Sequence, residues 1–183
     1  MRNSIFRIVD DVIAKGDDAL VCDDFGDEWA DFVGVDSTFD AEVVSFYHAK
    51  HGKSSLSASN LHEVVSQALK NVGRLVLTED DIETKAPSWA KTWQKSGIAR
   101  IRRGGDAAAF GELLRATSSR PRATKRICLV VSMLSKTLLD DLFDRCKKDQ
   151  ALAAHEVQLL HILMTFSGGC VESGAQPNIY VRP

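Results

Sequence analysis

Residues 23–53 constrain the fold of this chain more than any other stretch, because they contain two runs of strand-forming residues around a short polar turn. The first run, Glu28–Val35, and the second, Val43–Lys50, have the length and the aromatic and β-branched content of strands. The residues between them, Asp36–Asp40, predict a tight connection. We therefore expect the two strands to pair as a hairpin.

Chemically reactive side chains gather near the ends of this predicted hairpin. Asp31 lies on the first strand, and the second strand ends in His48, Ala49 and Lys50. Side chains alternate between the two faces of a strand, so His48 and Lys50 share a face. Pairing of the strands can bring Asp31 beside them. An acid, a potential metal ligand and a lysine would then converge, which is a combination used in metal-assisted phosphodiester hydrolysis.

The length and composition indicate one domain spanning residues 1–183. A chain of 183 residues can bury a sizeable core, and its 44% hydrophobic and 26% charged residues are ordinary for a globular protein. The cysteines are scattered and form no CxxC pair, which disfavours a zinc knuckle or a disulfide framework and fits a reduced, cytoplasmic setting. We expect no signal peptide and no membrane-spanning segment.

Charge is distributed unevenly along the chain. Residues 1–46 contain twelve acidic and three basic residues, whereas residues 85–126 contain eleven basic and two acidic residues. The acidic block suits cation binding and the basic block suits phosphate, although both can also be solvated surfaces. We expect DNA contacts from the basic residues that bracket a predicted helix, namely Arg100, Arg102, Arg103, Arg120, Arg122, Lys125 and Arg126.

Hydrophobic periodicity predicts alternating helices and strands. Helices are expected at residues 4–15, 60–72, 107–116, 135–148 and 150–171, and a short one after Pro87 carries Trp89 and Trp93. Strands are expected at residues 19–22, 28–35, 43–50, 127–134 and 178–181. The order of these elements predicts an α/β fold with a mixed β-sheet flanked by helices.

Two of these elements have a specific expected placement. Ile127–Leu134 is apolar on both faces, so we expect a central strand. Gln150–Val171 is apolar over much of its circumference, so we expect a largely buried helix. Residues 74–85 are ambiguous: the segment RLVLT fits a strand or the end of a helix, and an acidic loop is expected after it.

The order of helix, strand, strand with an acid, strand ending in x-Lys and helix resembles the core of the PD-(D/E)xK nuclease superfamily. Asp31 matches the first acid of the motif, and the segment from His48 to Lys50 matches (D/E)-x-Lys. The segments EWADF, FYHAK and NLHEVVSQALKNV further resemble a nuclease-like domain attached to large helicases, often in bacterial defence systems. The resemblance covers nearly the whole chain and implies a restriction-endonuclease-like core.

The resemblance implies a metal site. Asp31, His48 and the carbonyl of Ala49 would hold Mg²⁺ or Mn²⁺, and Glu28 or Asp11 could supply a further carboxylate. The metal would lower the pKa of a bound water and stabilise charge on the phosphate. At position 48 the superfamily usually carries Glu, Asp or Gln, so the histidine is a departure from its pattern.

Further roles follow for residues near this site. Lys50 would orient the nucleophile or offset charge in the transition state. Gln67, on the helix that follows, matches a glutamine that supports such sites in related nucleases, and Glu63 lies one helical turn earlier. Ordinary structural explanations stay open for the same residues: Asp31 as a strand-end acid, Lys50 as an exposed lysine and Glu63 as a partner of a helix cap.

Three functions fit the sequence. The first is a metal-dependent DNA endonuclease domain that acts with a helicase domain or subunit in anti-phage defence. The second is a catalytically degenerate PD-(D/E)xK fold that binds DNA or a partner protein without cleavage, which the histidine at position 48 favours. The third is an adaptor whose long C-terminal helix docks another subunit. The form of the nucleic acid, the oligomeric state and any attached domain stay open.

Overall fold

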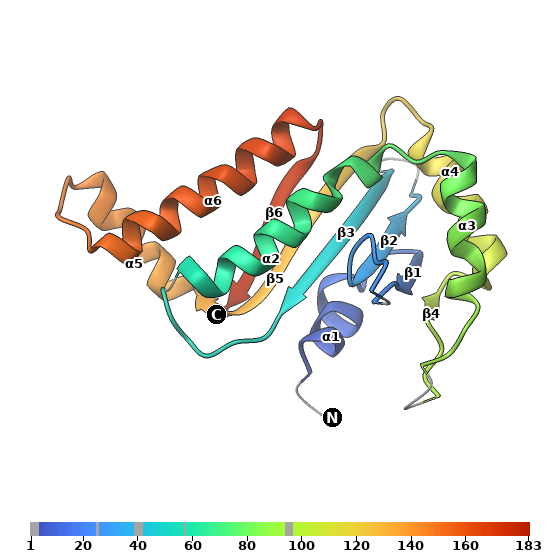
Figure 1. Ribbon diagram of the computed structural model, residues 1–183, viewed down its shortest axis with the longest axis horizontal. Coiled ribbons are helices and arrows are strands. Elements are labelled where there is room, and N and C mark those ends of the chain that lie inside the picture. Colours follow the sequence, from blue (N-terminus) through green and yellow to red (C-terminus); the bar gives the residue numbers. More distant parts are fainter. Residues whose placement is uncertain (1–3, 25, 39–41, 57, 94–96) are drawn as a thin grey trace.

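The computed structural model describes residues 4–24, 26–38, 42–56, 58–93 and 97–183, and it contains a mixed β-sheet with helices on both faces (Figure 1). The strands are β1 (Ala19–Cys22), β2 (Phe32–Asp36), β3 (Val43–Lys50), β4 (Ile101–Arg103), β5 (Thr124–Ser135) and β6 (Gln176–Arg182). The helices are α1 (Ile5–Ile8), continued by the π-helical η1 (Val9–Ile13), α2 (Ala58–Asn71), continued by the 3-10 helix η2 (Val72–Leu75), α3 (Glu79–Trp89), α4 (Ala107–Ser118), α5 (Lys136–Lys147) and α6 (Ala154–Glu172). These elements confirm the predicted α/β class.

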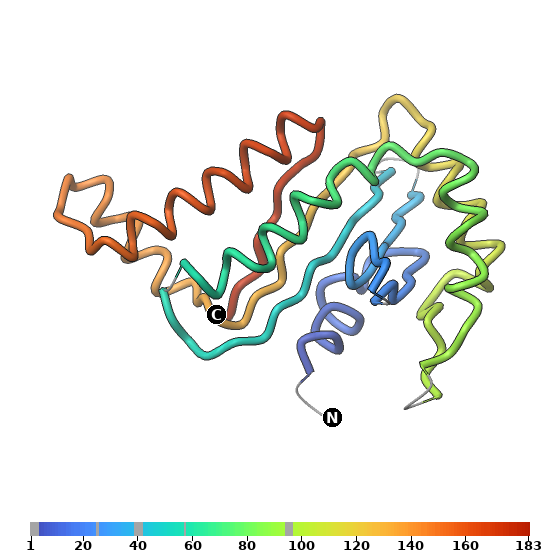
Figure 2. Tube along the Cα trace, in the orientation of Figure 1, coloured from blue at the N-terminus to red at the C-terminus, as the bar shows by residue number. Residues whose placement is uncertain are grey.

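The strands are arranged in the order β4-β1-β2-β3-β5-β6. Strands β1, β2 and β3 form an antiparallel meander, and β4 pairs antiparallel with β1. From β3 the chain crosses through α2 to reach β5, which runs parallel to β3, and α6 leads into β6, which runs parallel to β5. The trace in Figure 2 shows α2 and α6 side by side along these strands. The predicted candidate site on β2 and β3 therefore lies in the middle of the sheet.

Strand alternation divides the core between the two faces of the sheet. On one face, Val33, Phe46 and Leu129 belong to a large buried cluster that also contains residues of α2, α4 and α6. On the other face, Phe32 and Tyr47 belong to a smaller cluster with residues of α1 and η1. We call these the α2 face and the α1 face. Each face is covered by different helices, so the two can serve different purposes.

The hairpin of β2 and β3 is confirmed, but β2 begins later than the sequence predicts. The two strands pair antiparallel, with Phe32 opposite Tyr47. The expected strand began at Glu28, whereas the observed one begins at Phe32. The residues before it form a loop instead. The side chains of Asp23 and Asn71, which lie outside the hairpin, bind the backbone of Trp29 and Glu28. Part of the predicted turn, residues 39–41, lies outside the described residues.

The helix expected after Pro87 is wrong, because α3 begins well before it. A capping box at Thr78 starts α3, and Pro87 lies inside this helix near its end. Trp89 is the last residue of α3 and is buried, whereas Trp93 lies beyond the helix. The two tryptophans therefore do not share a helical face.

The central position predicted for β5 is confirmed, since β3 and β6 flank it. The largely buried position predicted for α6 is wrong. This helix packs against α2 and β6, and its buried residues are Glu156, Leu159, Phe166 and Cys170. Its apolar residues Val157, Met164 and Val171 are exposed, because a helix at the margin of a sheet buries one side only.

None of the helices in the described part of the chain combines the length and apolar character needed to cross a membrane.

Gly104, which directly follows β4, lies close against the backbone of Ala19 in β1. Its φ is 92°, and an added Cβ would lie 2.4 Å from the Cβ and 2.8 Å from the Cα of Ala19. A left-handed φ alone costs an alanine about 1–2 kcal/mol. We predict that Gly104→Ala lowers the free energy of unfolding, measured with urea, by about 2 kcal/mol or more.

Gly73→Ala is the matched control, because an added Cβ there meets nothing within 4 Å. This variant should change the free energy of unfolding by about 1 kcal/mol or less, and in the stabilising direction. A Gly104→Ala variant as stable as the native protein would contradict the close approach of the two backbones.

Candidate active site

The loop that precedes β2 is held by the carboxylate of Asp23, which is fully buried. Asp23 accepts hydrogen bonds from the backbone N–H of Trp29 and the indole N–H of Trp89, both at 2.8 Å. The ammonium of Lys85 pairs with this carboxylate at 3.0 Å and also donates to the carbonyl of Asp27. These bonds fix the loop against α3.

The pairing of Asp23 with Lys85 restricts this loop to one arrangement. The two side chains are 0% and 6% exposed, and burial raises the pKa of Asp23. Removing one partner of a buried pair leaves an uncompensated charge and costs about 3–5 kcal/mol. The backbone N–H of Asp23 also donates to the carbonyl of Asp31 at 2.9 Å. The position of Asp31 is therefore fixed together with the loop.

Asp31 lies immediately before β2 and is buried. Its carboxylate accepts a hydrogen bond of 2.6 Å from the backbone N–H of Ala49. Ala49 is the penultimate residue of β3, and Lys50 is the last. The structure therefore places the candidate acid against the segment that carries the candidate lysine.

The pKa of Asp31 is raised to about 7. Burial is the main cause, and the negative charges of Asp24 and Glu28 raise the pKa further. The hydrogen bond from Ala49 and the positive charge of Lys50 oppose this rise without cancelling it. The site therefore has more negative charge than its protein surroundings stabilise, and a bound cation would reduce that excess.

Lys50 forms an ion pair with Glu63, at 2.6 Å between Nζ and Oε1. The two side chains are 39% and 70% exposed. Exposed ion pairs contribute about 0–1 kcal/mol, so Lys50 can exchange this partner for a phosphate group at little cost. Glu63 belongs to α2, and the pair links the start of that helix to the end of β3.

Glu28 makes three hydrogen bonds, two with side chains of α2 and one with the backbone of its own loop. Gln67 donates to one carboxylate oxygen at 2.8 Å, and the backbone N–H of Gly26 donates to the other at 2.6 Å. The amide of Asn71 donates to the carbonyl of Glu28 at 3.2 Å. Asp11 lies in η1 on the α1 face, so of the two carboxylates proposed to complete the site Glu28 is the better placed.

His48 is fully buried, and neither of its ring nitrogens has a hydrogen-bond partner among the described residues. Burial lowers the pKa of this imidazole to about 4, so it is neutral at pH 7. Strand alternation puts His48 on the same face as Lys50. Phe32 lies opposite Tyr47, and Asp31 and His48 are the next residues of the two antiparallel segments. A neutral imidazole with unpaired nitrogens is suited to bind a metal or a water molecule.

The metal predicted for this site can be tested against these groups. No three His, Cys, Asp or Glu side chains form a metal-binding group in the part of the chain that the structure describes. Mg²⁺ nevertheless often takes one or two carboxylates and keeps several waters, so Asp31, the carbonyl of Ala49 and waters are a sufficient set. The unpaired nitrogens of His48 and the raised pKa of Asp31 both fit a cation here.

Four of the basic residues predicted to bind DNA have partners inside the protein. One is Arg120, which pairs with the carboxylate of Glu42, and the other three lie near β4. Arg100 is 3% exposed and donates to two backbone carbonyls. Arg102 pairs with the carboxylate of Asp10 at 2.7 Å, and Arg103 donates to the carbonyl of the same residue at 3.1 Å. Burial removes Arg100 from the surface, and the other two are already engaged at the β4 edge.

Arg120 and the three remaining basic residues gather at the N-terminal end of β5 and just before it: Arg120, Arg122, Lys125 and Arg126. This end of β5 lies beside the start of β3. Lys50 is at the other end of β3, seven residues further along, which is about 23 Å at 3.3 Å per residue. The basic cluster and the acidic site are therefore at opposite ends of the sheet.

Asp24 is a residue of the site that the sequence reasoning missed. Its charge raises the pKa of Asp31, and burial followed by the charge of Glu28 raises its own pKa. The sequence signal for it is an acidic pair, Asp23 and Asp24, directly after the apolar strand β1. The first acid of this pair anchors the loop and the second contributes charge to the site.

Comparison with protein-family models, with curated proteins and with solved structures gives no match to this chain. The resemblance to the PD-(D/E)xK superfamily therefore rests on the motif residues of the sequence. The function of the site is inferred from the geometry described above.

The raised pKa of Asp31 predicts how stability depends on pH. Asp31 has a pKa of about 7 in the folded protein and about 3.9 when unfolded, so the folded state binds the extra proton between these values. The stabilising contribution of Asp31 is complete below about pH 4 and is lost as the pH rises through 7. We predict that Asp31→Asn, which keeps an oxygen acceptor but does not titrate, removes this loss.

Urea unfolding of both proteins at pH 4.5 and pH 8 in metal-free buffer measures the effect. The stability of the variant relative to the native protein should rise by about 2–4 kcal/mol from the lower to the higher pH. Asp144→Asn removes a carboxylate that is 61% exposed and is the control that should show no such rise. If the free energies of unfolding of Asp31→Asn and the native protein differ by the same amount at both pH values, the raised pKa of Asp31 is contradicted.

Proposed function

We propose that the protein is a metal-dependent DNA endonuclease domain of the PD-(D/E)xK type. The hydrogen bond between Ala49 and Asp31 is the observation that carries this proposal, because it holds an acid of raised pKa where β3 presents Lys50. Asp24 and Glu28 add negative charge around the same point. An acidic centre next to one lysine suits a divalent cation and the phosphate that it binds.

The residues of the site divide the chemistry among them. Asp31, the carbonyl of Ala49 and His48 would hold Mg²⁺ or Mn²⁺, which supplies a bound water of lowered pKa and stabilises charge on the phosphate. Asp31 gives up its proton when the cation binds. Lys50 leaves Glu63 and orients the nucleophile or offsets the charge that develops on the phosphate. The hydrogen bonds around Asp31 keep it in place during these changes.

The biological setting of the proposal has narrower support. A helicase domain or subunit as partner, and a role in anti-phage defence, are supported by the sequence resemblance alone. DNA as substrate is supported by the basic cluster at the start of β5, of which Arg122 is exposed. The free cysteines Cys22, Cys128, Cys146 and Cys170 support a cytoplasmic setting.

Two other functions are each favoured by one observation. A fold that binds DNA or protein without cleavage is favoured by His48, because an enclosed imidazole replaces a carboxylate and removes one negative charge from the site. An adaptor function is favoured by α6, because Val157, Met164 and Val171 are exposed along it. Neither alternative explains why the negative charges of Asp24 and Glu28 act on a buried Asp31.

Cleavage of plasmid DNA in Mg²⁺ and in Mn²⁺ tests the endonuclease proposal. We predict cleavage that is faster in Mn²⁺, because a site with an imidazole nitrogen suits Mn²⁺ better than Mg²⁺. Asp31→Asn and Lys50→Ala should each lower the rate about 100-fold or more. Lys53→Ala is the matched control, since it removes an exposed lysine three residues away and should keep the native rate.

His48→Glu restores the carboxylate that the superfamily usually has, and it should narrow the difference between the two metals. His48→Gln serves the same comparison without a new charge if the glutamate variant does not fold. Native protein and a folded variant that both bind DNA and cut nothing in either metal would contradict the proposal. The function without cleavage would then account for the site.

The salt dependence of DNA binding tests the basic cluster. We predict that replacing Arg120, Arg122, Lys125 and Arg126 with alanine weakens binding and flattens its dependence on salt. The slope of log K against log salt should fall by about one for each lost phosphate contact. A triple alanine variant of Lys136, Lys147 and Lys148, on and just after α5, is the control for loss of charge elsewhere. An unchanged slope in the folded quadruple variant would assign DNA contact to other residues.

A further inference from the structure

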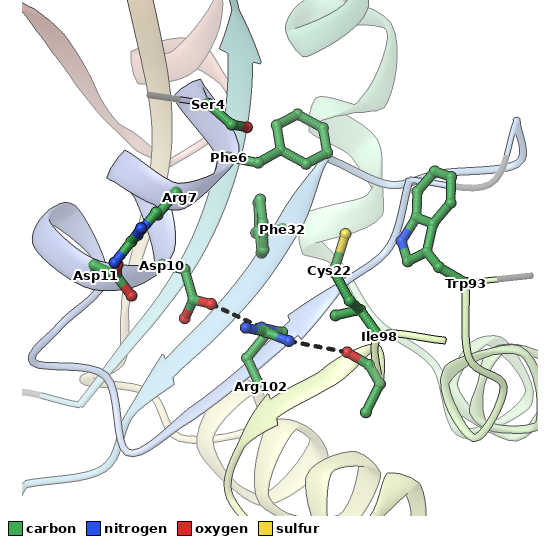
Figure 3. A pocket seen from close by; sticks show the side chains of 11 residues that line it. Ser4, Phe6, Arg7, Asp10, Asp11, Cys22, Phe32, Trp93, Ile98 and Arg102 are labelled. Atoms are coloured by element: carbon green, nitrogen blue, oxygen red, sulfur yellow. Dashed lines mark hydrogen bonds and ion pairs between the residues drawn. The ribbon is translucent and has the colours of Figure 1, made fainter. Parts of the chain in front are cut away.

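A cavity of about 460 Å³ opens on the α1 face of the sheet, away from the acidic site (Figure 3). Three aromatic side chains from separate parts of the chain line it: Phe6 of α1, Phe32 of β2 and Trp93, which follows α3. Figure 3 shows Phe6 next to Phe32, Trp93 beyond Cys22, and Asp10 and Arg102 at a polar end. The cavity therefore combines aromatic walls with a charged end.

The aromatic walls are held in place by their neighbours. Phe6 and Phe32 pack edge to face, with ring centroids 5.2 Å apart and an interplanar angle of 71°. The guanidinium of Arg100 lies 4.9 Å from the ring centroid of Trp93. The backbone N–H of Trp93 donates to the carbonyl of Ile98 at 2.9 Å, so the segment that carries the tryptophan is also tied. Fixed aromatic walls lower the entropy cost of binding a flat ligand.

The polar end presents a donor and an acceptor side by side. Arg102 Nε donates to Asp10 Oδ2 at 2.7 Å, and Arg102 Nη1 donates to the carbonyl of Ala99 at 3.3 Å. The Asp10 side chain is 13% exposed, and Arg103 lies 3.6 Å from its second oxygen. A guanidinium has five N–H groups, so Arg102 keeps donors beyond the two that bind Asp10 and Ala99, and its side chain is 31% exposed. Arg102 and Asp10 together can therefore offer an N–H group and a carboxylate to the same ligand edge.

We propose that this cavity binds a purine base. Its volume lies in the range of small-molecule sites. The faces of a purine can stack on Trp93 or Phe6, and base stacking on aromatic side chains is strong. The two fused rings of a purine offer a larger face for this stacking than the single ring of a pyrimidine. Its edge carries donors next to acceptors, which complement Asp10 and Arg102. The base can belong to a free nucleotide or to an unstacked nucleotide of a nucleic-acid strand.

This inference does not depend on the proposed nuclease activity, because it concerns the other face of the sheet and needs no metal. Binding of GMP, AMP, CMP and ribose 5-phosphate to the full chain, without divalent cations, is measured by calorimetry. Tryptophan fluorescence reports on the same site, since Trp29 and Trp89 are buried and Trp93 lines the cavity. GMP and AMP should bind at least tenfold more tightly than CMP, and they should change the emission.

A pair of matched variants locates the site. Ile98 lines the cavity and is 44% exposed, so Ile98→Glu puts a charge at the site without disturbing the core. Val76 is 71% exposed and does not line the cavity, so Val76→Glu is its control. Ile98→Glu should weaken purine binding at least tenfold, and Val76→Glu should leave it unchanged. Trp93→Leu, checked by thermal unfolding, should weaken binding as well.

Short single strands of dG or dA compared with dC distinguish the two sources of the base. Purine strands that compete with GMP indicate a base within nucleic acid, whereas GMP binding without such competition indicates a free nucleotide. The proposal is overturned if no purine compound binds, if CMP or ribose 5-phosphate binds as tightly as GMP, or if Ile98→Glu binds like the native protein. None of these results involves cleavage, so failure here leaves the nuclease proposal to its own test.

Discussion

The buried ion pair between Asp23 and Lys85 is the interaction on which the candidate site depends. It joins the end of β1 to α3, two elements that are far apart in the sequence. Trp29 donates to Asp23 through its backbone N–H and Trp89 through its indole N–H. The rings of these two tryptophans also pack edge to face, with centroids 5.5 Å apart. A buried charge needs all of its partners. Because Asp23 keeps these partners, the residues before β2 form a loop held against α3, although their composition alone suits a strand.

This loop explains both the chemistry of the site and its separation from the aromatic cavity on the α1 face. Burial, with the charges of Asp24 and Glu28 as smaller causes, raises the pKa of Asp31, and a bound cation would lower it. The next residue, Phe32, begins β2 and points to the opposite face. One position in the chain thus separates an acidic centre from an aromatic cavity. Arg100 contacts both regions, through the carbonyl of Asp24 and the ring of Trp93.

Much of the fold could be predicted from the sequence, because periodicity is a local property of the chain. The strands β1 and β3, the centre of β5 and the apolar face of α2 all follow from the spacing of apolar residues. The exposure of α6 could not be predicted in this way. A helix that is apolar all round has no preferred face, so its burial depends on how many neighbours the tertiary fold provides.

For the candidate site, the sequence by itself determined the acid, the lysine two residues after His48, and the strand alternation that gives His48 and Lys50 one face. The tertiary structure decided the rest. It places Glu28 beside α2 and Asp11 on the α1 face, and it lets the charge of Asp24 act on Asp31. It also buries His48, which lowers the pKa of this imidazole to about 4, and it puts the basic cluster at the far end of the sheet. Burial and electrostatic coupling act between residues that are distant in the chain, and no local pattern records those distances.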